Sequence, residues 1–600
     1  MILSILPPYN YYTKLSVKAD KIAVRQMSQI DKQIQKEYKY VLFDKYISQS
    51  LAQKYNKISC KEALSHAIDQ NGIDCTNYKG ISLADLNFDE TLQVAFIPCY
   101  REALAFISIV KKVNPTYIII SSDDPSIDIF KEISDQMGIQ INIYSSIGEV
   151  DDVKTCSIRK GIPIIRDNVG FHGFLNQPKY IEIIAQLVNN WSKFIRMIRG
   201  KKPFVGLVFY NPLKPVKSML IFQKEYYPLL FGLTRLKLGE LLFSGVHIFL
   251  MKDLFNRSNK YDSILEKYKK QLKNTKSIGQ IELEKQKISI SNSITNRLLK
   301  IAPMAFKQLI DNINVFESFI KKNDIKSFLS CSDGPWKTRL IVKLCQKYKI
   351  DNMVIMNGWL GDEFQQEAKL ATTTLCYGES YLKNYFKNKK DVRVTGNPLF
   401  DKAYEKRKFA NPKFPPRRIM IGSFTFSPAD INCHYYDNEK CLLDILDVLK
   451  RFKNDQNLKY EIVLKLHPAD CLEFYQWFLK ENGYSEIKII SHGNFQKSIS
   501  RFDLLIINYS TAIFETALMG IPVIFYHPNN QMLFEPFNGF KPLPTAFNKY
   551  ELEDILKKVF HDRDYAYSFT NLEVLRPFTG TMDGKSGDRI LGIITSNLNK

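Results

Sequence analysis

The chain has 600 residues, of which 45% are hydrophobic and 24% are charged. This is ordinary globular composition, which excludes a wholly disordered chain, and the length predicts two or three domains. Lys and Arg number 84 against 62 acids, a net charge of +22 that favours anionic partners such as nucleotide diphosphates, acidic glycans or an acidic membrane surface. No RNA- or DNA-binding signature accompanies the charge, so we expect no nucleic-acid partner.

Cysteine usage and the N-terminal sequence bear on the compartment. Ten cysteines are scattered between Cys60 and Cys471, without a CxxC pair or a Cys/His ligand spacing. This is typical of reduced thiols, and it predicts neither disulfides nor a structural zinc. The first residues, MILSILPPYNYY, lack a basic region followed by a long apolar stretch, so we expect no signal peptide and a cytoplasmic location.

Short apolar runs alternate with helix-length amphipathic segments, a rhythm that predicts parallel sheets flanked by helices. For residues 1–150 we predict an N-terminal α/β region, which is either a separate domain or the opening of the next one. Its expected helix covers Ser126–Met137, and its expected strands are Lys39–Phe43, Leu92–Ile97, Tyr117–Ser121 and Ile139–Tyr144.

A second α/β domain is expected over residues 203–405. Its predicted strands are Phe204–Phe209, Gly245–Leu250, Lys326–Ser330, Met353–Met356, Thr373–Tyr377 and Val392–Val394. Between the second and third of these strands, residues of about 258–322 form two polar helical stretches without a broad apolar stripe. We therefore expect a helical insertion on the surface, such as a lid.

The last domain, residues 417–600, follows a Pro- and charge-rich linker at Lys406–Pro416. Five predicted strands separated by helices make it a self-contained Rossmann-like unit: Arg418–Ile421, Tyr460–Leu466, Glu486–Ile490, Leu504–Ile507 and Pro522–Tyr526. In open α/β sheets, ligands bind outside the carboxyl ends of the strands, so the residues that follow each strand are the candidates for a site.

Polar residues follow two of these strands. His467-Pro468 comes directly after the second strand, where an imidazole can donate to a phosphate oxygen. Ser510-Thr511 precedes a helical run whose first N–H groups and dipole favour an anion. Glu515 lies on the first turns of that helix, where its carboxylate could accept from ribose hydroxyls. Ser423, after the first strand, completes the predicted donor site.

Taken singly, these residues also have plain structural interpretations. A lone histidine after a strand often caps a turn, and an isolated Ser-Thr pair is often a helix cap without a ligand. Their order along the chain and their convergence on one sheet edge favour a ligand site. The sequence contains no P-loop, no GxGxxG and no nucleophile elbow, which excludes kinase-like, dehydrogenase and hydrolase functions.

Ser500–Tyr526, together with Lys465–Pro468, resembles the donor half of GT-B transferases that build bacterial surface polymers. That group includes capsule Kdo transferases, bacterial polysialyltransferases and CDP-glycerol glycerophosphotransferases. Further matching segments are Cys376–Glu379, Val394–Pro398 and Asp583–Lys585, so the resemblance covers residues 325–600. It implies the GT-B fold, with two Rossmann-like domains facing across a cleft, and assigns His467 and Ser510-Thr511 to the donor phosphate and Glu515 to the ribose.

The resemblance further implies a CMP- or CDP-activated donor, a glycan or lipid-linked glycan acceptor, and peripheral contact with the inner face of the membrane. The chain departs from the group at Asn357-Gly358, where a histidine-glycine pair is usual, so no catalytic base is carried over there. Acceptor attack still needs a proton acceptor. Asp333, in a loop after a predicted strand, is the first candidate, followed by Asp362 and Glu363, and then by Asp123-Asp124. No metal site or cofactor is predicted.

We therefore predict a glycosyltransferase that moves a sugar such as Kdo or a sialic-acid relative from a CMP-activated donor to a capsule or lipopolysaccharide glycan. Three alternatives stay open. The first is a CDP-glycerol-type transferase of a polyol phosphate, which makes phosphodiester links. The second is a nucleotide-sugar epimerase, which needs no acceptor, and the third is a non-catalytic GT-B binding protein.

Overall fold

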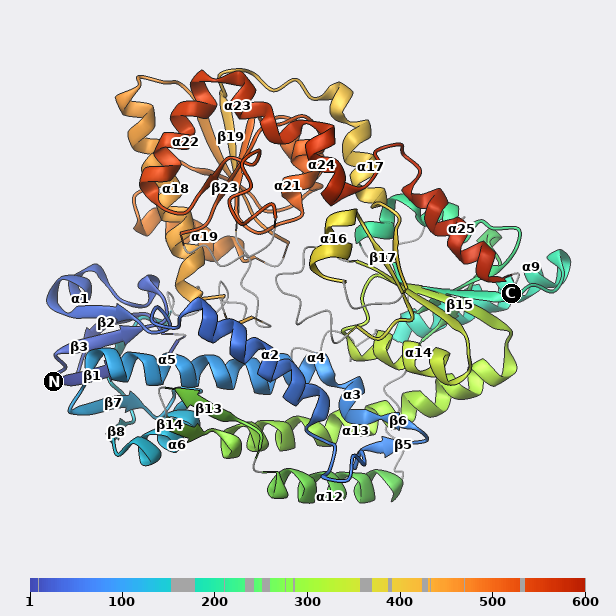
Figure 1. The fold of residues 1–600 in the computed structure, drawn as a ribbon, viewed down its shortest axis with the longest axis horizontal. Coiled ribbons are helices and arrows are strands. Elements are labelled where there is room, and N and C mark those ends of the chain that lie inside the picture. The colour runs from blue at the N-terminus through green and yellow to red at the C-terminus, as the bar shows by residue number, and fades with distance from the viewer. Residues whose placement is uncertain are drawn as a thin grey trace.

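Three parallel sheets, each flanked by helices, form the framework of the computed structural model (Figure 1). This confirms the predicted α/β class, the two Rossmann-like units and the additional N-terminal α/β region. The domain limits predicted from the sequence remain predictions, and each sheet lies within one of them. The structure describes residues 1–8, 10–152, 179–209, 211–231, 242–250, 259–275, 277–283, 286–356, 369–386, 391–423, 430–431, 433–468, 470–528 and 535–598.

The first sheet belongs to the N-terminal region. Its strands lie in the order β4 (Lys39–Leu42), β3 (Lys21–Val24), β1 (Ile2–Ile5), β7 (Tyr117–Ser121) and β8 (Gln140–Tyr144). The helices of this region are α1 (Lys32–Glu37), α2 (Gln49–Ser65), α3 (Leu83–Leu86), α4 (Phe88–Thr91), α5 (Ile97–Val113) and α6 (Ile127–Met137). Two small antiparallel pairs complete it: β2 (Tyr12–Leu15) with β9 (Gly148–Val150), and β5 (Asn77–Tyr78) with β6 (Ile81–Ser82).

The predicted strand Leu92–Ile97 is wrong. Leu92–Phe96 forms a π-helical turn that joins α4 to α5, so Phe88–Val113 is one continuous helical run. This run is long and apolar enough to cross a membrane by length and composition, but most of it is buried inside the fold. A buried helix is apolar on all sides, and its sequence then has the same apolar run as a buried strand.

The second sheet has seven parallel strands. Their order is β12 (His247–Phe249), β11 (Tyr227–Phe231), β10 (Phe204–Leu207), β15 (Ile325–Ser330), β16 (Asp351–Ile355), β17 (Thr373–Cys376) and β18 (Val392–Val394). The helices of this unit include α9 (Lys179–Arg199), α10 (Lys217–Ile221), α14 (Trp336–Lys347), α16 (Glu379–Asn384) and α17 (Pro398–Glu405). All six strands expected here from the sequence are present, and β11 is an addition.

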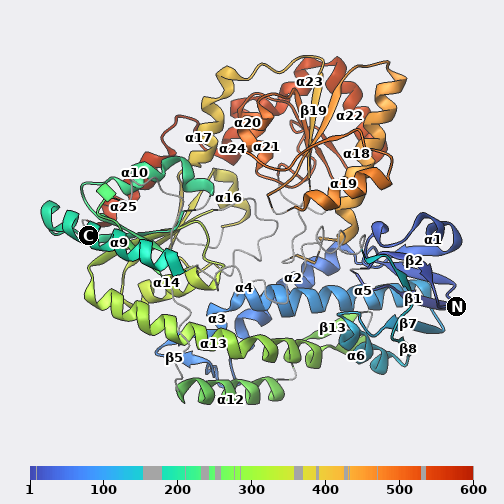
Figure 2. The ribbon, with the colours of Figure 1, turned by 180° about the vertical axis from the view of Figure 1, so that it is seen from behind.

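The segment between β12 and β15 is only partly a surface insertion. It contains α12 (Asn259–Asn274), an antiparallel hairpin of β13 (Gln280–Leu283) and β14 (Gln286–Ser289), and the long helix α13 (Ser291–Lys322). The expectation of a polar lid is wrong for α13, because apolar side chains along its length are buried against α3, α6 and α14. This helix runs beside α5 beneath the first and second sheets and joins their cores (Figures 1 and 2).

The third sheet has six parallel strands. Their order is β21 (Lys488–Ile490), β20 (Glu461–Lys465), β19 (Arg418–Gly422), β22 (Leu504–Ile507), β23 (Val523–Tyr526) and β24 (Thr545–Ala546). Its helices are α18 (Tyr435–Asp455), α19 (Leu472–Glu481), α20 (Phe495–Ile499), α21 (Ala512–Leu518), α22 (Lys549–His561), α23 (Arg563–Tyr567), α24 (Leu572–Thr579) and α25 (Ser586–Leu598). All five predicted strands are present here.

The three sheets share one strand order. In each, the first strand is central, the next two strands extend the sheet on one side, and the later strands extend it on the other. This doubly wound order creates a crevice at the carboxyl edge, between the first strand and the fourth, where α/β proteins bind ligands. The three crevices lie between β1 and β7, β10 and β15, and β19 and β22.

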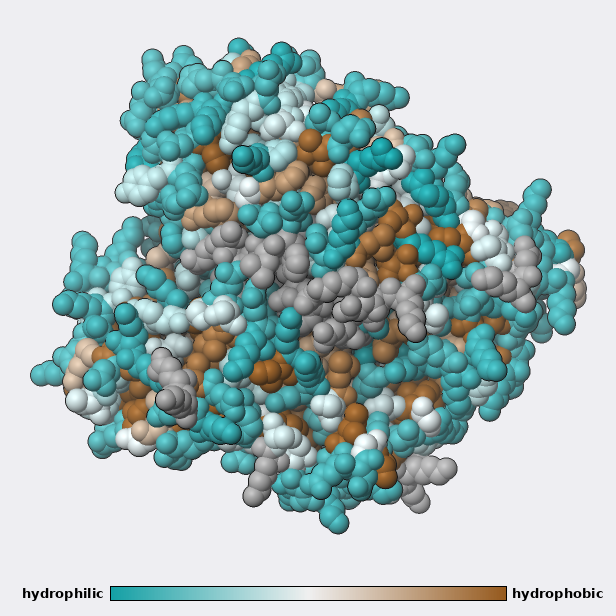
Figure 3. Space-filling view, viewed as in Figure 1, coloured by the Kyte–Doolittle hydropathy of each residue, from teal (hydrophilic) through white to brown (hydrophobic). Residues whose placement is uncertain are grey.

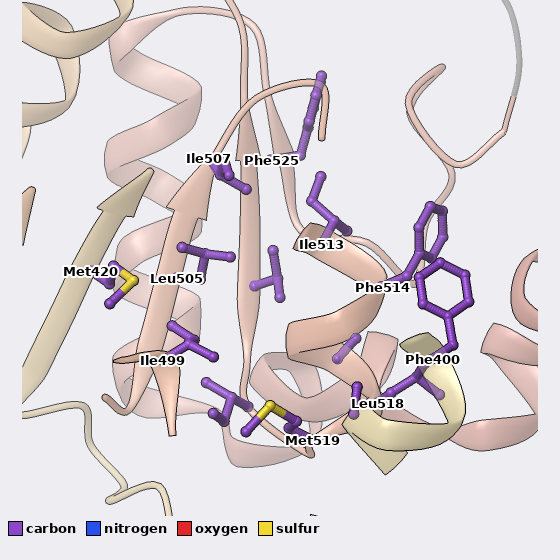
Figure 4. Close-up of a cluster of buried hydrophobic side chains, with 14 of the residues drawn as sticks. Phe400, Met420, Ile499, Leu505, Ile507, Ile513, Phe514, Leu518, Met519 and Phe525 are labelled. Atoms are coloured by element: carbon purple, nitrogen blue, oxygen red, sulfur yellow. The ribbon is translucent and has the colours of Figure 1, made fainter. Parts of the chain in front are cut away.

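The second and third units are tied together by two chain crossings. Phe400 of α17 packs against Phe514 of α21 in the core of the third unit, with ring centroids 5.9 Å apart (Figure 4). In the other direction, α25 returns to the second unit, where the Ser586 N–H donates to Asp401 at 2.9 Å. Gly396 has a φ of +77°, and a Cβ there would lie 2.4 Å from the Ser586 hydroxyl, so only glycine fits this crossing.

Residues at the carboxyl edge of the first sheet form hydrogen bonds to the third unit. The Ser28 N–H, after β3, donates to Glu439 of α18 at 3.1 Å, and the Ser28 hydroxyl bonds the same carboxylate. Asn56 donates to Asp430 at 2.8 Å and accepts from the Ile431 N–H at 2.9 Å. The first sheet therefore supports the start of α18.

Because Glu439 is buried, its ionisation should oppose folding. Burial raises the pKa of Glu439 from 4.5 to about 7, although the bonds from Ser28 oppose the shift. The folded state therefore binds this proton more tightly than the unfolded state, and the free energy of unfolding should fall by about 3 kcal/mol as pH rises from about 4.5 to 7. We expect Glu439→Gln to remove this loss, so the stability of the variant relative to wild type should improve between pH 5 and pH 8.

Chemical unfolding at several pH values measures this difference. Glu573→Gln is the control, since it is the same substitution at a glutamate whose side chain is 81% exposed. Parallel pH curves for wild type and Glu439→Gln would contradict the prediction.

Candidate functional site

The predicted donor residues lie at the carboxyl edge of the third sheet. β19 pairs with β20 and β22 so that Gly422 is opposite Lys465, and Ile421 is opposite Ile506. The three strands therefore end at nearly the same level, and Ser423, His467 and Asn508 leave the sheet side by side. This brings the predicted residues of two strand ends and one helix start to the crevice between β19 and β22.

A hydrogen-bond network fixes the turn that carries His467. The His467 N–H donates to the Ser423 hydroxyl at 2.7 Å and to Asp470 Oδ2 at 3.1 Å. The Ser423 hydroxyl in turn donates to Asp470, and the Ser423 N–H donates to the Lys465 carbonyl at 2.9 Å. Ser423, predicted as a donor-binding residue, thus holds the His467 turn in place through its side chain.

The His467 imidazole and the Pro468 ring project from this turn to solvent. Partial burial nevertheless lowers the pKa of His467, and Lys465 adds to this effect while Asp470 opposes it. Burial likewise raises the pKa of Asp470. A neutral imidazole at this position donates one hydrogen bond to an anion, and a bound phosphate would favour its protonated form.

Ser510 and Thr511 lie at the start of α21, as predicted, but their roles differ. The Ser510 hydroxyl accepts from the Ala512 N–H at 3.2 Å, whereas the Thr511 side chain makes no capping bond to the helix. Both residues are partly exposed at the crevice. Their contact with a donor phosphate stays a prediction.

Glu515 is directed into the protein. Its carboxylate accepts from Gln496 Nε2 at 2.8 Å, and Gln496 also accepts from Lys406 of the linker at 2.9 Å. Burial raises the pKa of Glu515 to about 7, and the Gln496 bond and the Lys406 charge only reduce the shift. Glu515 thus joins α21 to the linker, and its predicted bond to a ribose remains untested.

Sequence reasoning missed two residues at this edge. His527 follows β23, and its ring lies against Tyr509, which follows β22, with centroids 4.8 Å apart. Tyr509 and His527 thus lie at the carboxyl ends of two neighbouring strands, next to Ser510. A signal was available, because His527-Pro528 repeats the histidine-proline pair that directed attention to His467.

Asp333 lies at the corresponding crevice of the second sheet, after β15. It is fully buried, accepts from the Leu370 and Ala371 N–H groups at 2.6 and 2.9 Å, and pairs with Lys369 at 3.2 Å. Burial alone would raise the pKa of Asp333, but the Lys369 charge and the two backbone bonds outweigh it and lower the pKa. This geometry anchors the chain at residues 369–371 and weighs against Asp333 as a proton acceptor.

The structure describes only some of the remaining candidates for the catalytic base. Asp362 and Glu363, together with Asn357-Gly358, lie outside the described residues. Asp124 is buried in the crevice of the first sheet, where it pairs with Arg25 at 2.9 Å and accepts from the Ser126 N–H at 2.9 Å. Asp124 therefore has a structural role, while Asp123 is exposed.

A further acid, Glu90 of α4, lies beside the Asp333 loop. Burial and the charge of Asp89 raise the pKa of Glu90 to about 8, while a bond from the Trp336 N–H reduces the shift. Asp89 approaches the same loop, since a Cβ at Gly334 would lie 3.8 Å from its Oδ1. Sequence reasoning missed Glu90, which lies two residues before the apolar run Leu92–Ile97 that was mistaken for a strand.

Metal binding was not predicted from the sequence. Within the described parts of the chain, there is no group of three or more His, Cys, Asp or Glu side chains that could hold a metal ion. The absence of a metal and of a cofactor remains a prediction.

With the geometry of the third sheet established, comparison with known proteins shows what this part of the chain is similar to. Residues 433–596 match the family of CDP-glycerol:poly(glycerophosphate) glycerophosphotransferases. The match spans 164 of the 600 residues and includes His467, Pro468, Ser510, Thr511 and Glu515. It confirms the resemblance to transferases of bacterial surface polymers for this part of the chain. No curated protein matches the sequence significantly.

Several solved structures resemble the fold at low identity. The wall teichoic acid polymerase TagF with CDPG is 11% identical, with a TM-score of 0.35 over 70% of this chain and 95% of that one. UDP-GlcNAc 2-epimerase from Neisseria meningitidis is 12% identical, with a TM-score of 0.39 over 66% and 100%. The β-Kdo 2,7-transferase KpsC from Thermosulfurimonas dismutans is 17% identical, with a TM-score of 0.20 over 44% and 96%. TM-scores below 0.5 say nothing about activity.

Proposed function

We propose that the chain transfers a glycerol phosphate, or a related polyol phosphate, from a CDP-linked donor to a hydroxyl of a surface polymer. The observation that carries this proposal is the family match over the third unit, which contains the His467 turn and the start of α21. The CDP-polyol alternative therefore takes precedence over the Kdo or sialic-acid donor that the sequence favoured.

The chemistry assigned to the site follows from the charge of such a donor. A hydroxyl oxygen of the acceptor attacks the phosphorus that bears glycerol, the bond to the bridging oxygen breaks, and CMP leaves with the electron pair. Negative charge grows on the leaving phosphate, so hydrogen-bond donors that are already in place lower the barrier. His467, on a turn fixed by Ser423 and Asp470, is the donor that we assign to this phosphate.

The attacking hydroxyl must also lose its proton. Glu90 is the acid that we assign to this step in preference to Asp333, because its buried Oε2 has no hydrogen-bond partner among the described residues, whereas the Asp333 carboxylate is held by two backbone N–H groups and Lys369. Asp333 is fully buried with a lowered pKa. The cytoplasmic location and the absence of a required metal remain predictions.

Product analysis tests the proposal. The protein would be incubated separately with CDP-glycerol, CMP-Kdo and CMP-sialic acid, each with poly(glycerol phosphate) and with a capsular glycan as acceptor. A further incubation would contain UDP-GlcNAc without an acceptor. We expect CDP-glycerol to yield CMP and an equal amount of new phosphodiester, measured by ³¹P NMR. Growth of the polymer without new phosphorus would instead establish a sugar transferase. Conversion of UDP-GlcNAc without acceptor would establish an epimerase, and no turnover of any donor would favour a binding protein.

A further inference from the structure

The helix α9 exposes a continuous apolar surface at the edge of the second unit. Its inward side chains, Ala185, Val188 and Ser192, are buried against the sheet. Asn189 fixes the helix to β12, since it donates to the Ile248 carbonyl at 2.8 Å and accepts from the Ile248 N–H at 2.7 Å. One side of the helix is therefore fixed to the second sheet, and its opposite side faces solvent.

The outward side carries large apolar residues at helical spacing. Positions 183, 187, 191, 194 and 198 follow one another at intervals of three or four residues, so they form one stripe along the helix. The exposed members of this apolar stripe are Ile183, Ile184, Leu187, Trp191, Phe194, Met197 and Ile198. Leu187 is 63% exposed and Met197 is 76% exposed. Soluble monomers seldom expose so many large apolar side chains together.

A nearby segment of the same chain, at residues 242–243, extends the apolar stripe. The Trp191 indole N–H donates to the Leu242 carbonyl at 2.8 Å, and the adjacent Phe243 is itself exposed. The helix lies at the outer end of the molecule in both views (Figures 1 and 2). Brown hydrophobic side chains appear at this end of the space-filling view (Figure 3).

Positive charge accompanies the apolar stripe. Residues 179–202 contain six Lys and Arg and one acid, Glu182. Lys193, Arg199 and Lys201 are exposed around the end of the helix. An amphipathic helix with Trp, Phe and Leu on one side and basic residues beside them is the composition that lies in the interface of an anionic membrane.

We propose that α9 docks the protein on an anionic lipid bilayer, with the apolar stripe inserted among the acyl chains and the basic residues at the headgroups. The charge favours this occupant over a second copy of the chain, because two such surfaces would bring like charges together. The proposal does not depend on the proposed function, since it concerns a surface and not the chemistry at the third sheet.

Sedimentation with lipid vesicles tests this docking. The full chain would be mixed with vesicles of phosphatidylglycerol and phosphatidylcholine, or of phosphatidylcholine alone. We expect binding to the anionic vesicles that weakens with added salt. The double variant Leu187→Gln/Met197→Gln should lower the partition coefficient at least about tenfold, since two large apolar side chains are lost. The double variant Ile73→Gln/Phe409→Gln is the matched control, with original side chains 61% and 74% exposed, and should bind as wild type does.

Trp191 fluorescence provides a second measurement. We expect a blue shift with anionic vesicles that Trp191→Phe abolishes, because the indole would move from water to the interface. Absence of wild-type binding, or equal binding by Leu187→Gln/Met197→Gln, would overturn the proposal. A dimer that forms without vesicle binding and is lost in this double variant would also overturn it, since a second copy would then be the occupant.

Discussion

His467→Ala is expected to lower the rate of transfer by about 100-fold or more without lowering the melting temperature. The rate should fall because the imidazole is the hydrogen-bond donor assigned to the leaving phosphate, and loss of one such donor typically costs this much. Stability should be unchanged because the bonds that fix the turn come from the His467 backbone N–H, which alanine retains. The replaced side chain is exposed.

Steady-state release of CMP measures this effect, with thermal unfolding as the check on the fold. His492→Ala is the matched control, because His492 is also an exposed histidine and follows β21, at the edge of the same sheet. Its rate should stay close to that of wild type. Equal rates for His467→Ala and His492→Ala would remove His467 from the mechanism.

Asp124→Ala is expected to destabilise the first unit by about 3 kcal/mol. Its carboxylate pairs with Arg25 at 2.9 Å, and both side chains are almost completely buried. The Arg25 guanidinium would keep Glu102, at 2.8 Å, and the Leu6 carbonyl, at 2.6 Å, but would lose its closest fully buried counter-charge. A buried charge left without its partner typically costs 3–5 kcal/mol. The Ser126 N–H would also lose its acceptor.

Calorimetry should show this as a fall of roughly 6–12 °C in the melting transition of a unit of about 150 residues. Asp123→Ala is the control, since Asp123 is adjacent in sequence but exposed, and surface substitutions usually change stability by less than about 0.5 kcal/mol. Equal transitions for the two variants would contradict the structural role assigned to Asp124.

Five of the six strands of the third sheet were predictable from sequence because each is a short apolar run bounded by turn residues, whereas β24, which has only two residues, was missed. The first sheet was less predictable. β1 and β3 each have four residues, and the buried helical run Phe88–Val113 has no polar face to reveal its period. The long helix α13 was also misjudged, because it packs not only against α12 of its own segment but also against α3 and α6 of the first unit and α14 of the second.

The position of the candidate site followed from strand order, but the directions of its side chains did not. Ser423, His467 and Ser510 converge because parallel strands end at one edge. Whether Glu515 faces the crevice or Gln496 depends on the packing of α21 against the linker, which no local pattern encodes. Glu90 comes from a region distant in sequence, so only the folded chain brings it to the Asp333 loop.

The central claim is that the carboxyl edge of the third sheet binds the nucleotide of the donor through His467. Calorimetric titration of wild type and His467→Ala with CMP, CDP, UDP and GDP measures this most directly. We predict that wild type binds CDP in preference to UDP and GDP, and that His467→Ala binds CDP at least about tenfold more weakly, the loss of a charge-assisted hydrogen bond. Equal affinity of the two proteins for CDP, or no binding of cytidine nucleotides by wild type, would contradict the claim.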